Sequence, residues 1–385
     1  MHPIVIVGAG LAAWTTVREL RKLEATTPIT LVTADSGDFY AKPTLSNAFA
    51  QKRAPAELVT TPAHKMAESL QVTLMAHTRV TGIDPASHKL SSSQGDLMYR
   101  DLVLATGAQP VRVPLQGDAA ERVLSVNSLD DFASFHGQLT ASGGGDAGVK
   151  HVVIMGAGLI GCEFANDLIG AGYQVSVVDP SSRPLAALLP EGASQRLASS
   201  LGALGVQWHF EATVASVHVA GPRLEVGLSD GSSLTADLVL SAIGLKADTT
   251  LAQAAGIRCE RGIQVDANLM TSAEGIYALG DAAQYQSAGN RTLPYVMPIM
   301  QAAKTLAAVL AGQPTDLALG LMPVAVKTPA LPLTVLPPAP GVSGQWQADE
   351  EDVWRFLDEA GQQRGFVLAG HQTRQRMAQT KATLA

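Results

Sequence analysis

The sequence predicts an α/β protein with two doubly wound domains and a smaller α+β domain at the C-terminal end. Residues 3–35 hold a strand, a glycine-rich turn, a helix and a second strand, and residues 151–179 repeat this order. From residue 317 onward the pattern changes to short, Pro-rich strands. A repeat of this kind indicates two similar domains within one chain.

The later repeat has the complete pattern of a dinucleotide-binding unit. His151–Met155 form an apolar strand, and Gly156-x-Gly158-x-x-Gly161 leads from it into a helix. The first glycine permits a tight turn, the second lets the backbone approach a pyrophosphate, and the third lets helix and strand pack closely. A second strand then ends at Asp179. The alternative interpretation is a doubly wound domain that binds no nucleotide.

Asp179 bears on which nicotinamide cofactor binds. A carboxylate at this position accepts a hydrogen bond from a ribose 2′-hydroxyl and repels a 2′-phosphate, which favours NADH over NADPH. Arg183 follows shortly after and could pair with a 2′-phosphate, so NADPH stays an alternative.

The first repeat indicates a second nucleotide. An apolar strand leads into Gly8-x-Gly10-x-x-Ala13, a helix is expected over Leu11–Leu23, and the next strand ends at Asp35. A chain needs two such units when it holds two dinucleotides at once, and FAD with a nicotinamide cofactor is the economical pair.

Composition limits the class of protein. A chain of 385 residues that is 46% hydrophobic can bury large cores in two or three domains. A net charge of −7 argues against a nucleic-acid or anionic membrane partner. Cys162 and Cys259 cannot form a disulfide framework and suit a reducing compartment. No apolar run is long enough to span a membrane, so we expect a soluble, cytoplasmic protein.

We expect a discontinuous first domain over residues 1–110 and 246–316, a second over 111–245 and a C-terminal domain over 317–385. Similar segments, DLVLATG and DLVLSAIG, end each nucleotide unit with a buried strand.

Alternating residues predict strands between these elements. Residues 71–83 and 88–99 are expected to form a meander with a turn at Asp84-Pro85, and residues 208–219 one strand of a pair with a turn at Asp230-Gly231. Residues 141–148 have the composition of a glycine-rich linker.

Several phrases identify a family. Tyr40-x-Lys42-Pro43-x-Leu45-Ser46, after the acid-tipped strand, resembles the FAD-dependent pyridine-nucleotide reductases related to glutathione reductase. HTRVTGIDP, GAGLIGCEFANDL, LPYVMPIM and PVAVKTPALPL together resemble bacterial rubredoxin reductases, over all three domains. The resemblance implies an enzyme that passes electrons from NADH through FAD to rubredoxin one at a time, for alkane hydroxylation or an oxidative-stress chain. It also implies a C-terminal domain that covers the flavin.

The resemblance assigns residues to each cofactor. Those implied at FAD are Gly8, Ala9, Gly10, Leu11, Ala34, Asp35, Lys42, Val80, Thr106, Gly107, Glu163, Asp281, Val296 and Lys327. Those implied at NADH are Gly156, Gly158, Leu159, Ile160, Gly161, Asp179 and Gly244. No side chain is expected to act as general acid or base, since the flavin carries the chemistry.

Lys42, Glu163 and Lys327 are expected to tune the flavin. The related ferredoxin reductases have a lysine where this chain has Asn47, so Lys42 is expected to serve in place of that lysine. From the residues alone, a solvated loop charge is the favoured interpretation of Lys42, and the resemblance reverses it; Glu163 has the alternative of a first-turn acid favoured by the helix dipole.

The acceptor has alternatives. Two separate cysteines provide no redox pair and no thiolate metal cluster, so electrons must leave the flavin directly. Ferredoxin or another iron–sulfur carrier is the nearer alternative to rubredoxin. A signalling flavoprotein similar to apoptosis-inducing factor is the other, but it needs basic tracts, and this chain has only a weak one at Arg364, Arg374, Arg376 and Lys381.

We expect a monomer without a metal ion.

Overall fold

The computed structural model describes residues 2–141 and 150–383. The chain divides into two compact units, and each unit is built from three separate segments of the sequence. Unit 1 comprises residues 1–41, 59–109 and 245–320, and unit 2 comprises residues 42–58, 110–244 and 321–385. The predicted linker over residues 141–148 lies outside the described residues except for Ala141.

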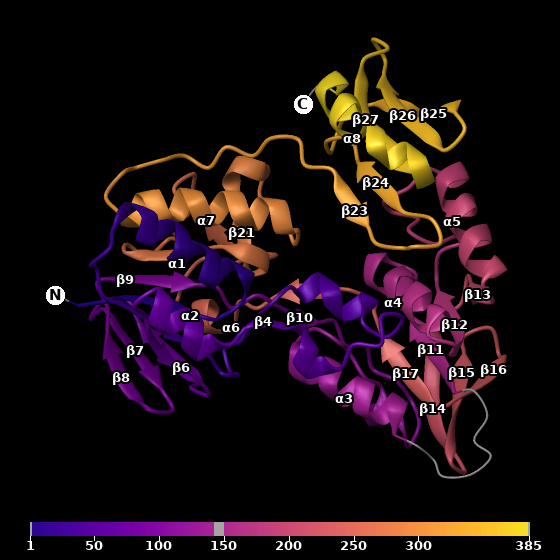
Figure 1. Cartoon of the computed structure of the whole chain (residues 1–385), viewed down its shortest axis with the longest axis horizontal. Coiled ribbons are helices and arrows are strands. Elements are labelled where there is room, and N and C mark those ends of the chain that lie inside the picture. The colour runs from indigo at the N-terminus through magenta and orange to yellow at the C-terminus, as the bar shows by residue number, and fades with distance from the viewer. Residues whose placement is uncertain (1, 142–149, 384–385) are drawn as a thin grey trace. The chain divides into compact units, whose positions relative to one another are not determined.

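Unit 1 is built on a five-stranded parallel sheet (Figure 1). Its order is β20 (Ile276–Ala278), β9 (Asp101–Leu104), β1 (Ile4–Val7), β2 (Ile29–Val32) and β5 (Thr73–Met75). The central strands are buried throughout, as continuous apolar runs such as IVIV require. Helices α1 (Leu11–Leu23) and α7 (Val296–Leu310) pack against each other beside this sheet.

The other elements of unit 1 are short. They are β3 (Phe39–Tyr40), β4 (Val59–Thr61), α2 (Ala63–Ser69), β6 (Val80–Asp84), β7 (Lys89–Ser92), β8 (Gly95–Met98), β10 (Ala108–Pro110), β18 (Leu245–Ala247), α6 (Thr250–Ala254), β19 (Ile263–Val265), η4 (Gly280–Ala282), β21 (Ala283–Tyr285), η5 (Gln286–Ala288) and β22 (Arg291–Thr292).

The predicted strand over residues 71–83 is wrong as a single element. Its first half is β5, which joins the parallel sheet, and its second half is β6, which begins the meander β6-β7-β8. His77 lies between them with a φ of 50°, a left-handed conformation that turns the chain out of the sheet.

Unit 2 holds a four-stranded parallel sheet. Its order is β13 (Gln207–Phe210), β12 (Gln174–Asp179), β11 (His151–Met155) and β17 (Leu238–Ser241). Helices α3 (Leu129–Thr140), α4 (Leu159–Gly170) and α5 (Glu191–Ala203) belong to this unit, as does the meander of β14 (Val214–Ala220), β15 (Arg223–Leu228) and β16 (Ser233–Ala236).

The predicted strand over residues 208–219 is likewise two strands. Glu211 has a φ of 58° and separates β13, in the parallel sheet, from β14, in the meander. The predicted turn at Asp230-Gly231 is confirmed between β15 and β16, where Gly231 has a φ of 88°.

The C-terminal part of unit 2 is a five-stranded antiparallel sheet in the order β23 (Val324–Val326), β24 (Leu333–Leu336), β27 (Gln363–Ala369), β26 (Val353–Asp358) and β25 (Gly344–Glu350). The chain then ends in η6 (Gly370–Gln375) and α8 (Arg376–Ala382). Strand β25 had no sequence signal because most of its side chains are exposed and do not alternate in polarity. None of the helices described here could cross a lipid bilayer.

Candidate functional site

The glycine turn of unit 1 fits a pyrophosphate. Gly8 has a φ of 108°, and a Cβ on it would collide with the Ala105 carbonyl, so only glycine suits the turn. Beside Gly10, by contrast, a Cβ would meet no protein atom within 4 Å. Helix α1 begins there without a side-chain cap, which leaves its first backbone N–H groups open to an anion.

The glycine turn of unit 2 repeats this geometry. Gly156 has a φ of 99°, and a Cβ on it would lie 2.8 Å from the Ala242 carbonyl oxygen. Gly161 packs against the Gly156 carbonyl with no room for a side chain. Gly158 faces open space and begins α4 without a side-chain cap. Both turns therefore have the tight first glycine and open second glycine that a dinucleotide requires.

The acids at the two strand tips have different partners. The Asp179 carboxylate accepts from the backbone N–H of Ala157 at 2.6 Å, within the glycine turn, and from that of Ser181 at 2.8 Å. The Asp35 carboxylate instead accepts from the Thr33 hydroxyl at 2.6 Å and the Gly37 N–H at 2.9 Å. Asp35 and its neighbour Ala34 are exposed.

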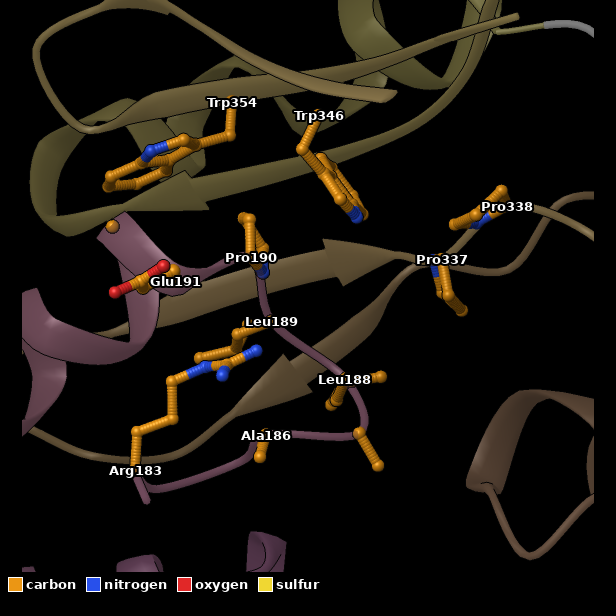
Figure 2. A pocket seen from close by; sticks show the side chains of 12 residues that line it. Arg183, Ala186, Leu188, Leu189, Pro190, Glu191, Pro337, Pro338, Trp346 and Trp354 are labelled. Atoms are coloured by element: carbon orange, nitrogen blue, oxygen red, sulfur yellow. The ribbon is translucent and has the colours of Figure 1, made fainter. Parts of the chain in front are cut away.

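Arg183 lies in a separate cavity of unit 2. The cavity measures about 600 Å³ and is lined by residues 186–192, Pro337, Pro338, Trp346 and Trp354 as well as Arg183. Figure 2 shows the Arg183 side chain among the residues that line this cavity, and its buried Nε has no hydrogen-bond partner among the described residues. Across the described part of the chain, no ion pair joins Arg183 to Asp179.

A buried charge cluster forms around Glu163 on α4. Its side chain is 5% exposed, and Oε2 lies 2.7 Å from both the Lys327 Nζ and the Ser46 hydroxyl. Oε1 accepts from the backbone N–H of Lys327 at 3.0 Å. The Lys327 Nζ also donates to the Pro43 carbonyl. Three distant parts of the sequence thus meet within unit 2, with both carboxylate oxygens satisfied.

Lys42 has a different partner. It begins the 3₁₀ helix η1 (Lys42–Asn47), and its Nζ donates to the Asn127 side-chain oxygen at 2.7 Å. Asn127 directly precedes the capping box of α3, in which the Ser128 hydroxyl accepts from the Asp131 N–H at 3.1 Å. The structure therefore brings Glu163 and Lys327 into contact and pairs Lys42 with Asn127.

The other predicted FAD residues lie in unit 1. Thr106 follows β9 and donates to the Asp248 carbonyl at 2.9 Å, and Gly107 has a φ of 74°. Asp281 follows Gly280, where a Cβ would lie 3.0 Å from that of Ala12 in α1. Of the remaining two predicted FAD residues, Val80 is the first residue of β6 and Val296 is the first residue of α7.

Three further predicted NADH residues belong to unit 2 and follow the ends of its parallel strands. Leu159 and Ile160 form the first turn of α4, and the Ile160 side chain is 43% exposed. Gly244 follows β17 and is exposed with a φ of 121°.

Both cysteines are free thiols. Cys162 is fully buried, donates to the Ala157 carbonyl at 3.3 Å, and has its pKa raised by that burial. Cys259 donates to the Ile257 carbonyl at 3.4 Å, and burial raises its pKa as well. Raised pKa values keep both thiols protonated, and a protonated thiol is a weak nucleophile.

Sequence reasoning missed two residues of α4. Asn166 accepts from the Ala330 N–H at 2.9 Å, and Asp167 accepts from the N–H groups of Phe49 and Ala50 at 3.0 and 2.8 Å. Both are buried. Their signal was the spacing i, i+3, i+4 with Glu163 on an otherwise apolar helix, which places three polar side chains on one face.

A family model described as pyridine nucleotide-disulphide oxidoreductase matches residues 2–305. The chain belongs to this family. Membership confirms the predicted fold class, the oxidoreductase activity and the cofactor pair FAD and NADH. A second model, described as rubredoxin binding C-terminal domain, matches residues 316–383.

Individual relatives agree with the two family matches. The rubredoxin-NAD(+) reductase of Alcanivorax borkumensis is 44% identical, over 99% of this chain and 98% of its own length. The nitric oxide reductase FlRd-NAD(+) reductase of Aeromonas salmonicida is 40% identical, over 96% of this chain and 93% of its own length. The covalent putidaredoxin reductase–putidaredoxin complex has the same fold, with a TM-score of 0.88 and 24% identity over 99% of this chain and 93% of that one. The resemblance to rubredoxin reductases is confirmed.

Proposed function

We propose that this protein is a reductase that passes electrons from NADH through FAD to rubredoxin. The match of residues 316–383 to a rubredoxin-binding domain carries the proposal, because two nucleotide units alone serve many electron acceptors. The relative from Alcanivorax borkumensis, whose name states this activity, is similar along nearly its whole length.

Unit 1 supplies the proposed contacts to the adenosine and pyrophosphate of FAD. The open second glycine and the uncapped start of α1 support this assignment. The residues proposed are Gly8, Ala9, Gly10, Leu11, Ala34, Asp35, Val80, Thr106 and Gly107. Asp281 is proposed for the ribityl chain, and the N–H of Val296 for the pyrimidine end of the ring.

Lys42, Glu163 and Lys327 are proposed to tune the flavin. Bound FAD accepts a hydride from NADH and supplies electrons singly, so the protein's own task is to position and bias it. A lysine beside the ring stabilises the negative charge gained on reduction, and a carboxylate opposes it. Because Glu163 is paired with Lys327, their opposing effects are coupled.

Unit 2 supplies the proposed NADH site, at Gly156, Gly158, Leu159, Ile160, Gly161, Asp179 and Gly244. The carboxylate of Asp179 lies at the glycine turn, where a ribose 2′-hydroxyl could replace one of its backbone donors. Arg183 lines another cavity, which supports the preference for NADH.

A second acceptor comes from the other named relatives. The protein from Aeromonas salmonicida is named for FlRd and is 40% identical, so FlRd is the competing candidate. Turnover of the FAD-loaded enzyme with NADH should be measured with rubredoxin, FlRd and a plant-type [2Fe–2S] ferredoxin, with ferricyanide as a control for flavin competence. We expect the highest kcat/KM with rubredoxin. A higher value with FlRd or ferredoxin, at equal ferricyanide reduction, would reassign the acceptor.

We also propose that the enzyme works as a monomer in the cytoplasm, in alkane hydroxylation or an oxidative-stress electron chain. Two free thiols suit a reducing compartment. Sedimentation velocity of the FAD-loaded protein tests the monomer, and a dimer at micromolar concentration would overturn it.

A further inference from the structure

The segment Lys42–Leu58 is an excursion from one unit into the other. Residues on both sides of it belong to unit 1, whereas the segment itself belongs to unit 2. The residues that flank the segment lie next to each other in unit 1, where Tyr40 of β3 pairs with Val59 of β4. Within unit 2 the segment, all of which the structure describes, contains only short 3₁₀ turns and no strand, so no sheet ladder fixes its position.

Besides the contacts of Lys42, Pro43 and Ser46 described above, two anchors hold the middle of the excursion on unit 2. The first is apolar: the ring of Phe49 lies 5.2–5.9 Å from those of Phe132, Phe135, His136 and Tyr173. Aromatic contacts of this kind bury apolar area and prefer edge-to-face or stacked geometry, but they satisfy no backbone N–H group. The second anchor is polar, and it consists of the two backbone hydrogen bonds that end on Asp167.

Asp167 adds directional hydrogen bonds to this apolar packing. Its two oxygens serve different donors, Oδ2 the N–H of Phe49 and Oδ1 that of Ala50. The residue is 2% exposed, and burial raises the pKa of its carboxyl although the backbone N–H groups act in the opposite direction. Burying a carboxylate costs desolvation free energy, and here two hydrogen bonds offset that cost. Because each oxygen accepts from a different residue, the segment Lys42–Leu58 is held at one position along α4.

We propose that Asp167 is a positioning residue for the charge cluster: by fixing the backbone at Phe49 and Ala50, it sets Ser46 against Glu163 and Lys327. Ser46 lies one turn earlier in the same segment, and its hydroxyl lies 2.7 Å from the Glu163 carboxylate and 3.2 Å from the Lys327 Nζ. Asn166 fixes the other side by accepting from Ala330, close to Lys327. Helix α4 thus aligns both segments that meet at Glu163.

The expected effect of Asp167 on flavin reduction rests on the proposed role of the cluster at the flavin. The placement of Ser46 by Asp167 does not, since all the contacts involved lie within unit 2. The test therefore needs one readout without FAD and one with it.

Asp167→Asn is the first variant, because it keeps the shape but turns an amide N–H₂ toward one backbone donor. Asp237→Asn is the control: the Asp237 carboxylate also accepts a backbone N–H, that of His151 at 2.8 Å, and pairs with Arg223 at 3.3 Å, without contacting the cluster. Ala50→Pro removes one donor from the opposite side and changes no residue of α4, so it decides the case if Asp167→Asn does not fold.

The readout without FAD is amide hydrogen exchange of the apoprotein. Exchange over Lys42–Leu58 should accelerate in Asp167→Asn and in Ala50→Pro, and stay at the native rate in Asp237→Asn. A folded Asp167→Asn or Ala50→Pro protein with native exchange in this segment would overturn the proposal.

The readout with FAD is a double-mutant cycle with Ser46→Ala. Reduction of the flavin by NADH should slow by about tenfold or more in Asp167→Asn, and its potential should shift. Both effects should shrink when Ser46 is already replaced by alanine, because Asp167 acts through that side chain. Effects that simply multiply would contradict this. No rubredoxin enters either readout, so failure of the acceptor proposal would leave these results standing.

Discussion

Lys327 and Glu163 form an ion pair in which 2.7 Å separates the lysine Nζ from the glutamate Oε2, although they lie 164 positions apart in the sequence. The lysine side chain is 34% exposed and the glutamate 5% exposed. Burying one partner so deeply costs desolvation free energy, which the pair and the hydrogen bonds of Ser46 and the Lys327 backbone offset. The pair therefore places one buried and one partly exposed charge in the proposed flavin environment.

Changing this pair should move the flavin potential in opposite directions. A charge about 4 Å away at an effective dielectric near 20 is worth roughly 4 kcal/mol before screening. Even a quarter to a third of that corresponds to roughly 30 mV for a two-electron couple. Lys327→Ala should make the flavin harder to reduce, and Glu163→Gln should make it easier. Spectroelectrochemistry measures both, and potentials unmoved within error would show that the pair is not at the flavin.

Asp179 should set the preference for NADH. Asp179→Ala removes the acceptor for the ribose 2′-hydroxyl and the repulsion of a 2′-phosphate, so the ratio of kcat/KM for NADH to that for NADPH should fall about tenfold or more. Ser181→Ala is a suitable control because it keeps the backbone N–H that Asp179 accepts. An unchanged ratio would mean that the carboxylate does not meet the cofactor.

The two thiols should be dispensable. Cys162→Ser with Cys259→Ser should leave NADH-dependent turnover largely intact, since the hydroxyl introduced in place of the Cys162 thiol inherits the Ala157 carbonyl as an acceptor. Turnover is measured with FAD retention and thermal unfolding as controls for the fold. Loss of turnover in a folded, FAD-loaded variant would indicate a thiol step.

His151 should add an acid-sensitive contribution to stability. Burial chiefly lowers its pKa, so as the pH falls below about 6.5 the unfolded chain takes up the proton before the folded protein does. Stability from this group is present above that pH and decreases as the pH falls. Urea unfolding between about pH 5 and 8 should show a shallower acid slope in His151→Gln than in the native protein. Parallel slopes would contradict the assignment.

Local patterns predicted the two nucleotide units well. The strand His151–Met155 and the helix Leu11–Leu23 match the structure residue for residue, because a buried strand and a glycine-initiated helix are encoded within a few neighbouring residues. Both mistaken strands failed at a single non-glycine residue with positive φ, His77 or Glu211, which composition does not mark.

The charge cluster could not be predicted in the same way. Nothing near Lys42 indicates that its segment packs on the second unit, since that depends on Asp167 and on rings contributed from α3. Family resemblance proposed Glu163 and Lys327 together, and the structure adds the contact between them and the part of Ser46. Asp167 was overlooked because an acid inside a helix is usually solvated.

The central claim is that reduced flavin in this protein delivers electrons to rubredoxin. In an anaerobic stopped-flow experiment, NADH is first mixed with the FAD-loaded enzyme to bleach the flavin, and oxidised rubredoxin is then added. We predict that rubredoxin loses its visible absorbance at a rate at least as fast as steady-state turnover, while the flavin reoxidises. Flavin that reduces normally but stays reduced in the presence of rubredoxin, or passes electrons more slowly than turnover, would contradict the claim.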